Sequence, residues 1–138
     1  MHEPLHNVAL FSRNYFPDGD HGGNSIAIKR NGDVTNLHVV WDALLNGVDN
    51  VSLDEKTREI LSNDVVSIRS ISDWAVHHQG MAQKFVYTKE VKTKILQQVS
   101  SRRDPEISLS PEYLASAGQL AKSQVIIAGH RIAALITN

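Results

Sequence analysis

The sequence predicts a mainly α-helical protein with one small β-hairpin. Apolar residues recur at helical spacing in two stretches, residues 37–48 and 111–136. In residues 25–30, isoleucines instead alternate with polar neighbours, which indicates a short strand. Asn31-Gly32 follows this strand and is typical of a hairpin turn. With 138 residues, of which 41% are hydrophobic, the chain is long enough for one domain with a core of its own.

Composition excludes several classes of protein. The formal net charge of −1 provides no basic field for nonspecific nucleic-acid binding, so any such binding has to be local to a site. The absence of cysteine excludes disulfides, thiolate metal sites and cysteine nucleophiles. No run of about 18 apolar residues suits a membrane span, and we expect no membrane partner. The first residues lack the basic and apolar regions of a signal peptide.

The first segment, residues 1–24, is expected to be loop. It is rich in turn residues: Pro17 fixes its backbone angle φ, and Gly22-Gly23 admits positive φ. The strand of residues 25–30 and its hairpin turn separate this loop from the next helix.

The helix after the hairpin is the organising element of the predicted fold. Thr35 or Asn36 can cap its start, and Gly47 can end it. Its apolar stripe consists of Leu37, Val40, Trp41, Leu44, Leu45 and Val48. At about 100° per residue, His38 and Asp42 project from the same side, at the border of this stripe.

Three further helices are expected in the middle of the chain. The capping box Ser52-Leu53-Asp54-Glu55 starts a short helix that runs to about residue 61. The next helix begins at Ser70 or Ser72, with Gly80 as a weak point, and another covers residues 89–99. The Ser70 or Ser72 helix has one face made of Ile71, Trp74, Ala75, His78, Ala82 and Phe85.

A long helix ends the chain. Ser110-Pro111 provides an N-cap followed by a proline at the first helical position, and the helix runs to about Ile136. Its predicted buried stripe is Leu114, Ala117, Ala121, Val125, Ala128, Ile132 and Leu135.

His38 and Asp42 are the first candidates for a site. An imidazole nitrogen and a carboxylate oxygen are both ordinary zinc ligands, and on a helix this spacing lets two side chains close on one ion. A catalytic zinc commonly has three protein ligands and an open position, so a third ligand has to come from elsewhere. A solvated surface pair is the commoner reason for such a spacing, and the helix alone does not decide between the two.

Several stretches, in order along the chain, carry a family resemblance that covers nearly the whole chain. They are His2-Glu3-Pro4-Leu5-His6, Gly22-Gly23-Asn24-Ser25-Ile26, Asn36-Leu37-His38-Val39-Val40-Trp41-Asp42, Trp74-Ala75 with Phe85-Val86-Tyr87, and Ala128-Gly129-His130-Arg131-Ile132-Ala133-Ala134-Leu135. Together they resemble the class I zinc-dependent single-strand nucleases of the mung bean nuclease type, to which zinc phospholipase C is distantly related. The loop of residues 18–24 resembles the bacterial branch most.

The resemblance implies a mainly helical zinc nuclease and phospholipase C-like fold with three zinc ions in a cleft. It implies that His6, His38 and Asp42 are the protein ligands of one of these ions. Asn24 matches the asparagine that lines the substrate side of the cleft, and Trp41 is expected to pack the ligand helix in place. No side chain of this chain is assigned as catalytic.

Other histidines receive no site role. His2 lies within the His-x-Pro-Leu-His motif but is not expected to be a ligand. His77-His78 departs from the family pattern after Trp-Ala, and both are expected at the surface.

The resemblance implies that the ligands of the other two ions lie in an N-terminal half of the family that we expect to be missing from this chain. We therefore expect residues 1–138 to form a single partial domain, the C-terminal half of a zinc nuclease, with the protein ligands of at most one zinc. We also expect Met1 to be an internal methionine of a longer protein, or the chain to come from a truncated gene. Helix faces without partners favour self-association through exposed apolar surface.

The activity implied by the resemblance is zinc-dependent phosphodiester hydrolysis of single-stranded DNA or RNA by an endonuclease, with 3′-nucleotidase activity as an extension. The partners are then single-stranded nucleic acid or nucleotides, and we expect weak or no activity from this chain alone. One alternative is a non-catalytic zinc-binding remnant or interaction module. Another is phospholipase C. Asp42 disfavours it, because the pattern of the phospholipase branch at this place resembles His-x-x-x-Glu. Relatives of full length are secreted or periplasmic.

Overall fold

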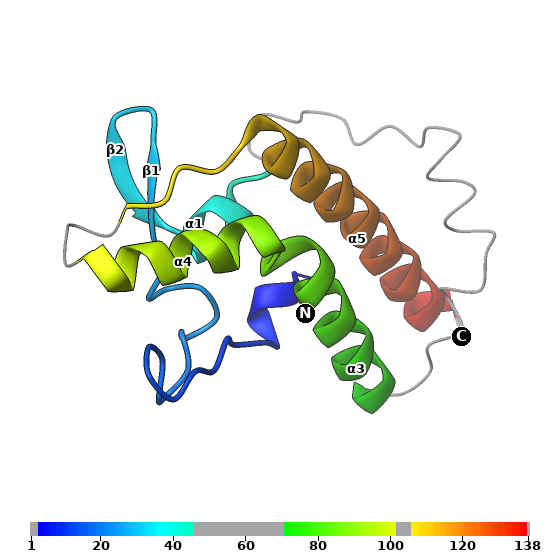
Figure 1. The fold of residues 1–138 in the computed structure, drawn as a ribbon. Helices are drawn as coiled ribbons and strands as arrows, with labels where there is room; N and C mark the ends of the chain where they lie inside the picture. Colours follow the sequence, from blue (N-terminus) through cyan, green and yellow to red (C-terminus); the bar gives the residue numbers. More distant parts are fainter. Residues whose placement is uncertain (1–2, 46–70, 102–105, 138) are drawn as a thin grey trace.

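The computed structural model describes residues 3–45, 71–101 and 106–137, which are mainly helical with one two-stranded sheet (Figure 1). This confirms the predicted fold class. The predicted helix of residues 52–61 lies outside the described residues. Among the helices described, none has both the length and the hydrophobicity that a membrane span requires.

The first segment holds a short 3-10 helix, η1 (Pro4–His6), where the sequence had predicted only loop. The carboxylate of Glu3 caps it by accepting a hydrogen bond from the Leu5 N–H at 3.0 Å. Proline at the first helical position suits this turn because its missing N–H would have no partner there. Pro4 and Leu5 are buried, so η1 is attached to the core.

Residues 10–20 form a loop that is closed by the buried Asp20. The Asp20 carboxylate accepts hydrogen bonds from the Leu10 N–H at 2.8 Å and from the Tyr87 hydroxyl at 2.7 Å. The Asp20 N–H donates in turn to the Leu10 carbonyl oxygen at 2.9 Å. Burial and the hydrogen bond to Asp20 raise the pKa of the Tyr87 hydroxyl, which therefore remains a donor. Both ends of the loop are thus fixed to each other and to Tyr87.

The predicted hairpin is present as strands β1 (Ala27–Arg30) and β2 (Asp33–Asn36), which pair antiparallel. Asn31 and Gly32 both have positive φ, 53° and 91°, as a tight two-residue hairpin turn requires. Ile107 lies on the other edge of β1 and exchanges backbone hydrogen bonds of 2.9 and 3.0 Å with that strand. The segment after the later helices therefore returns to the hairpin.

Helix α1 (Leu37–Asp42) begins where it was predicted but ends earlier. The Asn36 side chain caps it by accepting from the Val39 N–H at 2.8 Å. The chain leaves the helix at Ala43 because the Leu44 N–H bonds the Trp41 carbonyl oxygen at 3.2 Å in a tighter turn. The predicted end at Gly47 is therefore wrong, although Leu44 still packs against the core.

The middle helices are α3 (Ile71–Met81), a π-helical turn η3 (Ala82–Val86), and α4 (Lys89–Ser101). The helical path continues through Gly80, and η3 contacts both η1 and α5 (Pro111–Thr137). Figure 1 shows η3 where α3 and α4 meet, so it joins the N-terminal and C-terminal parts of the fold.

Helix α5 has the predicted helical period, but its buried face is rotated from the predicted stripe. Within that stripe Ala117 is buried and Leu114, Ala121 and Ala128 are half-buried, whereas Val125 is 46% and Ile132 58% exposed, which is where the prediction is wrong. The other buried residues described on this helix are Tyr113, Gln124 and Ile127. The helix is rotated so that Tyr113 faces the core. Sequence periodicity alone does not fix this rotation, because apolar side chains lie on both neighbouring faces.

A hydrogen-bonded chain joins α1, α5 and η3. The buried Trp41 donates from its indole Nε1 to the Tyr113 hydroxyl at 2.9 Å. The Tyr113 hydroxyl donates to the Val86 carbonyl oxygen at 3.1 Å. Tyr113 therefore satisfies two buried polar groups at once, and Trp41 packs α1 against α5.

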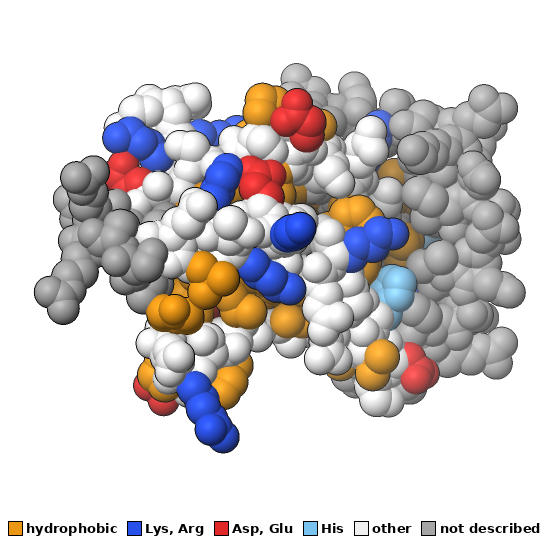
Figure 2. All heavy atoms as spheres, viewed as in Figure 1, with side chains coloured by type: hydrophobic (Ala, Val, Ile, Leu, Met, Phe, Trp, Pro, Cys, Tyr) orange, Lys and Arg blue, Asp and Glu red, His pale blue; other side chains and the backbone are white. Residues whose placement is uncertain are grey.

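Hydrophobic side chains also reach the surface in places. Between α4 and the loop of residues 10–20 they line a hollow of about 210 Å³ beside the lysines of α4 (Figure 2). Val125, Ile132 and Ile136 are exposed on α5. These are the surfaces that self-association would use, and that association stays a prediction.

We expect Tyr113→Phe to lower the free energy of unfolding by about 1–3 kcal/mol, because it leaves the Trp41 N–H and the Val86 carbonyl without partners. Urea unfolding measures this change. Tyr15→Phe, in the half-buried part of the loop, is the matched control and should change stability by less than about 0.5 kcal/mol. Equal effects of the two variants would contradict the role given to Tyr113.

Candidate metal centre

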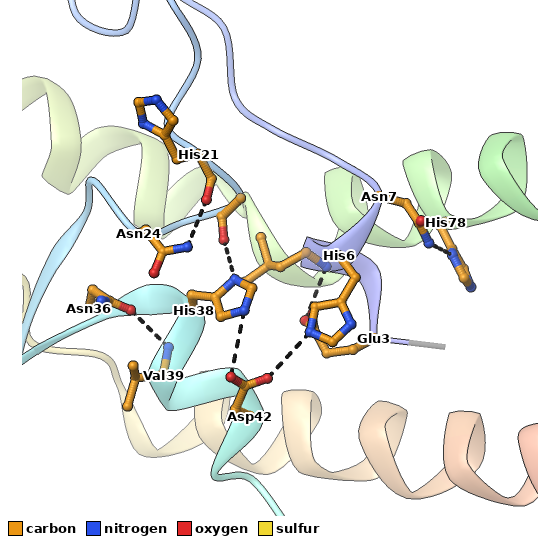
Figure 3. A network of polar contacts seen from close by, with 12 residues as sticks. Glu3, His6, Asn7, His21, Asn24, Asn36, His38, Val39, Asp42 and His78 are labelled. Carbon is orange, nitrogen blue, oxygen red and sulfur yellow. Dashed lines mark hydrogen bonds and ion pairs between the residues drawn. The ribbon is translucent and has the colours of Figure 1, made fainter. Parts of the chain in front are cut away.

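Four side chains from η1 and α1 converge on one point: Glu3, His6, His38 and Asp42. Each offers one ligand atom, and these atoms lie within 4.8 Å of one another. Figure 3 shows the two rings and the two carboxylates turned toward each other. The structure thus brings His6, His38 and Asp42 together, as the sequence predicted, and adds Glu3.

Asp42 lies between the two histidines. Its Oδ1 is 3.6 Å from His6 Nε2, and its Oδ2 is 3.5 Å from His38 Nε2. The two rings are stacked with their centroids 5.3 Å apart. Side-chain exposure is 50% for Asp42 but 21% for His38, so the group opens to solvent on the side of Asp42.

The tautomer of His38 is set by a backbone contact. Its Nδ1 lies 2.8 Å from the Gly22 carbonyl oxygen. Because that oxygen can only accept, Nδ1 carries the proton and donates it. In the neutral ring Nε2 then keeps its lone pair and lies 3.5 Å from Asp42 Oδ2, and this tautomer can bind a metal through Nε2.

Two glycines allow the backbone carrying this carbonyl to come close. Gly22 has φ of +63°, and a Cβ there would lie 2.6 Å from the Leu5 carbonyl oxygen. Gly23 has φ of +85°, and a Cβ there would lie 3.2 Å from the backbone nitrogen of His38. The Gly22-Gly23 pair therefore lets the loop pass between η1 and α1.

Glu3 was missed by sequence reasoning, although it lies within the His2–His6 motif. Its Oε1 caps η1, whereas Oε2 is 3.4 Å from His6 Nε2. Oε2 is buried and has no hydrogen-bond partner in the described part of the chain. Burial raises the pKa of the Glu3 carboxyl. Its place three residues before a candidate ligand, at a helix cap, was the available clue.

The spacing of these atoms fits a small divalent ion. With bonds of about 2.0–2.1 Å, neighbouring ligands of a tetrahedral zinc lie about 3.4 Å apart. Three contacts within the group are of this order: His6 Nε2 lies 3.4 Å from Glu3 Oε2 and 3.6 Å from Asp42 Oδ1, and His38 Nε2 lies 3.5 Å from Asp42 Oδ2. One ligand atom from each of the four residues fits within 4.8 Å of the others. The three contacts exceed ordinary hydrogen bonds in length, and two imidazoles with carboxylates favour zinc over magnesium or calcium. The unpartnered buried oxygen of Glu3 also suits a nearby cation.

The remaining predicted residues lie around this group. Asn24 is exposed, and its Nδ2 donates to the His21 carbonyl oxygen at 2.8 Å. His77 is exposed, as expected. His78 was expected at the surface, but this is wrong: it is 2% exposed, and its Nδ1 accepts from Asn7 Nδ2 at 2.6 Å. This bond anchors the segment next to His6 to α3.

Two cavities flank the group. One, of about 470 Å³, is lined by residues 5–9 together with His21, Gly22 and His38. The other, of about 250 Å³, has an apolar wall from α5 and is bounded by Glu3 and Asp42. The candidate ligands therefore form the boundary between two spaces that a substrate could enter.

Comparison with known families gives one match. The family model described as S1/P1 Nuclease matches residues 1–138. The chain belongs to the S1/P1 nuclease family. No curated protein and no solved structure matches it.

Membership of the S1/P1 nuclease family confirms the resemblance seen in the sequence motifs. The family is zinc-dependent in general, which agrees with the donor set of the candidate group. The assignments to the bacterial branch and to the C-terminal half of the family stay predictions.

We expect Gly22→Ala to destabilise the protein by about 2 kcal/mol or more, since it combines positive φ with a backbone clash. It should also weaken zinc binding, because the displaced carbonyl no longer orients His38. Gly32→Ala is the matched control: it has positive φ but open space around the added Cβ. Thermal unfolding and zinc titration are measured on both variants. Gly32→Ala reports the effect of positive φ alone, and the difference between the two variants reports the effect of the clash. A Gly22→Ala protein that binds zinc like the wild type would contradict the orienting role.

We expect Glu3→Gln to stabilise the zinc-free protein at neutral pH by on the order of 1 kcal/mol, since it removes a buried carboxylate. Because the pKa of folded Glu3 is raised, its contribution to stability is present below the unfolded pKa and is lost as pH rises through the folded pKa. Glu3→Gln does not lose this stability as the pH rises. Its free energy of unfolding should therefore exceed that of the wild type at neutral pH, and the difference should vanish in acid. Unfolding curves across pH test this, with exposed Glu112→Gln as the control.

Proposed function

We propose that this chain binds one zinc ion through His6, His38 and Asp42, and that the site hydrolyses phosphodiester bonds in single-stranded nucleic acid. The observation that carries the proposal is the convergence of these ligand atoms within 4.8 Å of one another in a chain of a nuclease family. Glu3 flanks this site with its unpartnered oxygen. We further propose a secreted or periplasmic location, since the family is generally secreted.

The roles of the residues follow from their contacts. His38 would bind the ion through Nε2, because its Nδ1–H is already donated to the Gly22 carbonyl oxygen. Asp42 supplies negative charge between both rings, which suits a cation at their centre. Zinc held here would supply Lewis-acid chemistry: by withdrawing electron density from a phosphoryl oxygen it would make the phosphorus easier to attack. Three protein ligands leave a further position for a water or a phosphate oxygen.

Asn24 is proposed as a substrate contact. Its Nδ2 is committed to the His21 carbonyl, so the amide presents Oδ1 outward as an acceptor. An acceptor in this place suits the N–H groups of a nucleobase whose edge is free. Bases are free in this way in single strands but are paired in a duplex, which agrees with a single-strand preference.

The first experiment is zinc per chain by elemental analysis, on protein refolded with zinc and then dialysed. We expect about one zinc in the wild type and loss of it in His38→Ala, because a two-ligand remnant binds far more weakly. His77→Ala, an exposed histidine on α3, is the matched control and should keep its zinc. No zinc in the wild type would overturn the proposed site.

Hydrolysis is then measured on single-stranded DNA, duplex DNA and phosphatidylcholine with the zinc-loaded protein. Zinc-dependent cleavage of the single strand supports the proposal. Zinc binding without cleavage would make the chain a non-catalytic zinc protein instead. Hydrolysis of the phospholipid but not of DNA would assign it to phospholipase chemistry.

A further inference from the structure

The cavity of about 470 Å³ beside the ligand group contains a third histidine, His21. It lies across the cavity from the segment that carries His6, on the loop whose Gly22 carbonyl holds His38. A volume of this size is within the usual range for small-molecule sites. His21 takes no part in the ligand group, so its presence on this wall needs another explanation.

The position of the His21 ring is set by local contacts. Its backbone has φ of 55°, a left-handed conformation that histidine adopts more readily than most residues. Its Nδ1 lies 3.0 Å from the Ser25 hydroxyl, and its carbonyl oxygen accepts from Asn24. When the Ser25 hydroxyl donates to Nδ1, the ring proton lies on Nε2, which can then donate to a ligand (Figure 3 shows the position of the ring).

The charge of the lining distinguishes this cavity from its neighbour. Among the described residues that line it, the ionisable ones are the histidines His6, His21 and His38, and none is a carboxylate. The other cavity is bounded by Glu3 and Asp42. We therefore expect the carboxylates to repel an anionic group from the second cavity, so that the first cavity is the more favourable place for it.

We propose that His21 binds the phosphate of a nucleotide by donating a hydrogen bond from Nε2, and so selects which cavity the substrate strand enters. This inference rests on the proposed function, because it takes nucleic acid as the ligand. In this arrangement His21 contacts a phosphate next to the metal site, and it is not itself a ligand of the metal. Asn24, held to the same residue, then faces the base of that nucleotide.

The test uses thymidine 5′-monophosphate added to zinc-loaded protein, followed by the ring signals of the histidines in ¹H–¹⁵N NMR. The His21 signal is identified by its loss in His21→Asn, since asparagine also tolerates a left-handed backbone. We expect the His21 signal to shift and that of exposed His77 to stay. We also expect His21→Asn to weaken nucleotide binding about tenfold with zinc content unchanged, as for one lost charge-assisted hydrogen bond.

Three further arms make the result decisive. Inorganic phosphate should shift the His21 signal too, whereas thymidine without phosphate should not. A shift with thymidine as large as with the nucleotide would overturn the proposal, as would wild-type affinity in His21→Asn. His77→Asn serves as the matched variant and should bind the nucleotide normally.

Failure of the proposed function can be told apart from failure of this inference. If the wild type binds no zinc, the proposed metal site is wrong. Titration of the zinc-free protein with phosphate then still tests whether His21 binds phosphate. A shift of its ring signal then supports phosphate binding in this cavity, and no shift overturns it. If zinc binds and single strands are cleaved equally by wild type and His21→Asn, only the inference fails.

Discussion

The candidate ligands meet because one six-residue helix is held from two sides. A helix as short as α1 is not stable by itself in water, so its position has to come from tertiary contacts. Trp41 provides one, through its hydrogen bond to Tyr113 on α5. His38 provides the other, through its bond to the Gly22 carbonyl. The helix cannot turn about its axis without breaking one of these bonds, and the direction of Asp42 is thereby fixed as well.

The ligand group also separates two cavities whose linings differ in chemical character. The cavity on one side is lined by carboxylates and the apolar wall of α5. The cavity on the other side is lined by imidazoles and by residues 5–9. If the group holds a metal ion, the carboxylates disfavour the approach of an anion on their side, so the proposed substrate would enter from the side of the imidazoles. On this proposal the direction of entry depends on which side chains border each cavity.

Sequence reasoning succeeded where a short stretch determines its own structure. The hairpin turn at Asn31-Gly32 and the Asn36 cap needed only local chemistry, and they placed His38 and Asp42 on one face of a helix. It failed where distant contacts decide. The rotation of α5 depends on Tyr113 reaching Trp41, and the buried His78 has its hydrogen-bond partner in the distant Asn7. No local pattern contains these pairings. Glu3 was missed because its turn was taken for loop.

The closure of residues 10–20 by Asp20 bears on how the length of this chain can vary. The tip of the loop, around the bridge between Ser12 and Phe16, lies beyond the closing bonds, and it contributes no side chain to the ligand group. Once the two ends are joined, extra residues at the tip add little entropy cost. Insertions there should leave the spacing of His6 and His38 intact. The same tip is a suitable place to graft a peptide tag or a fluorescent reporter.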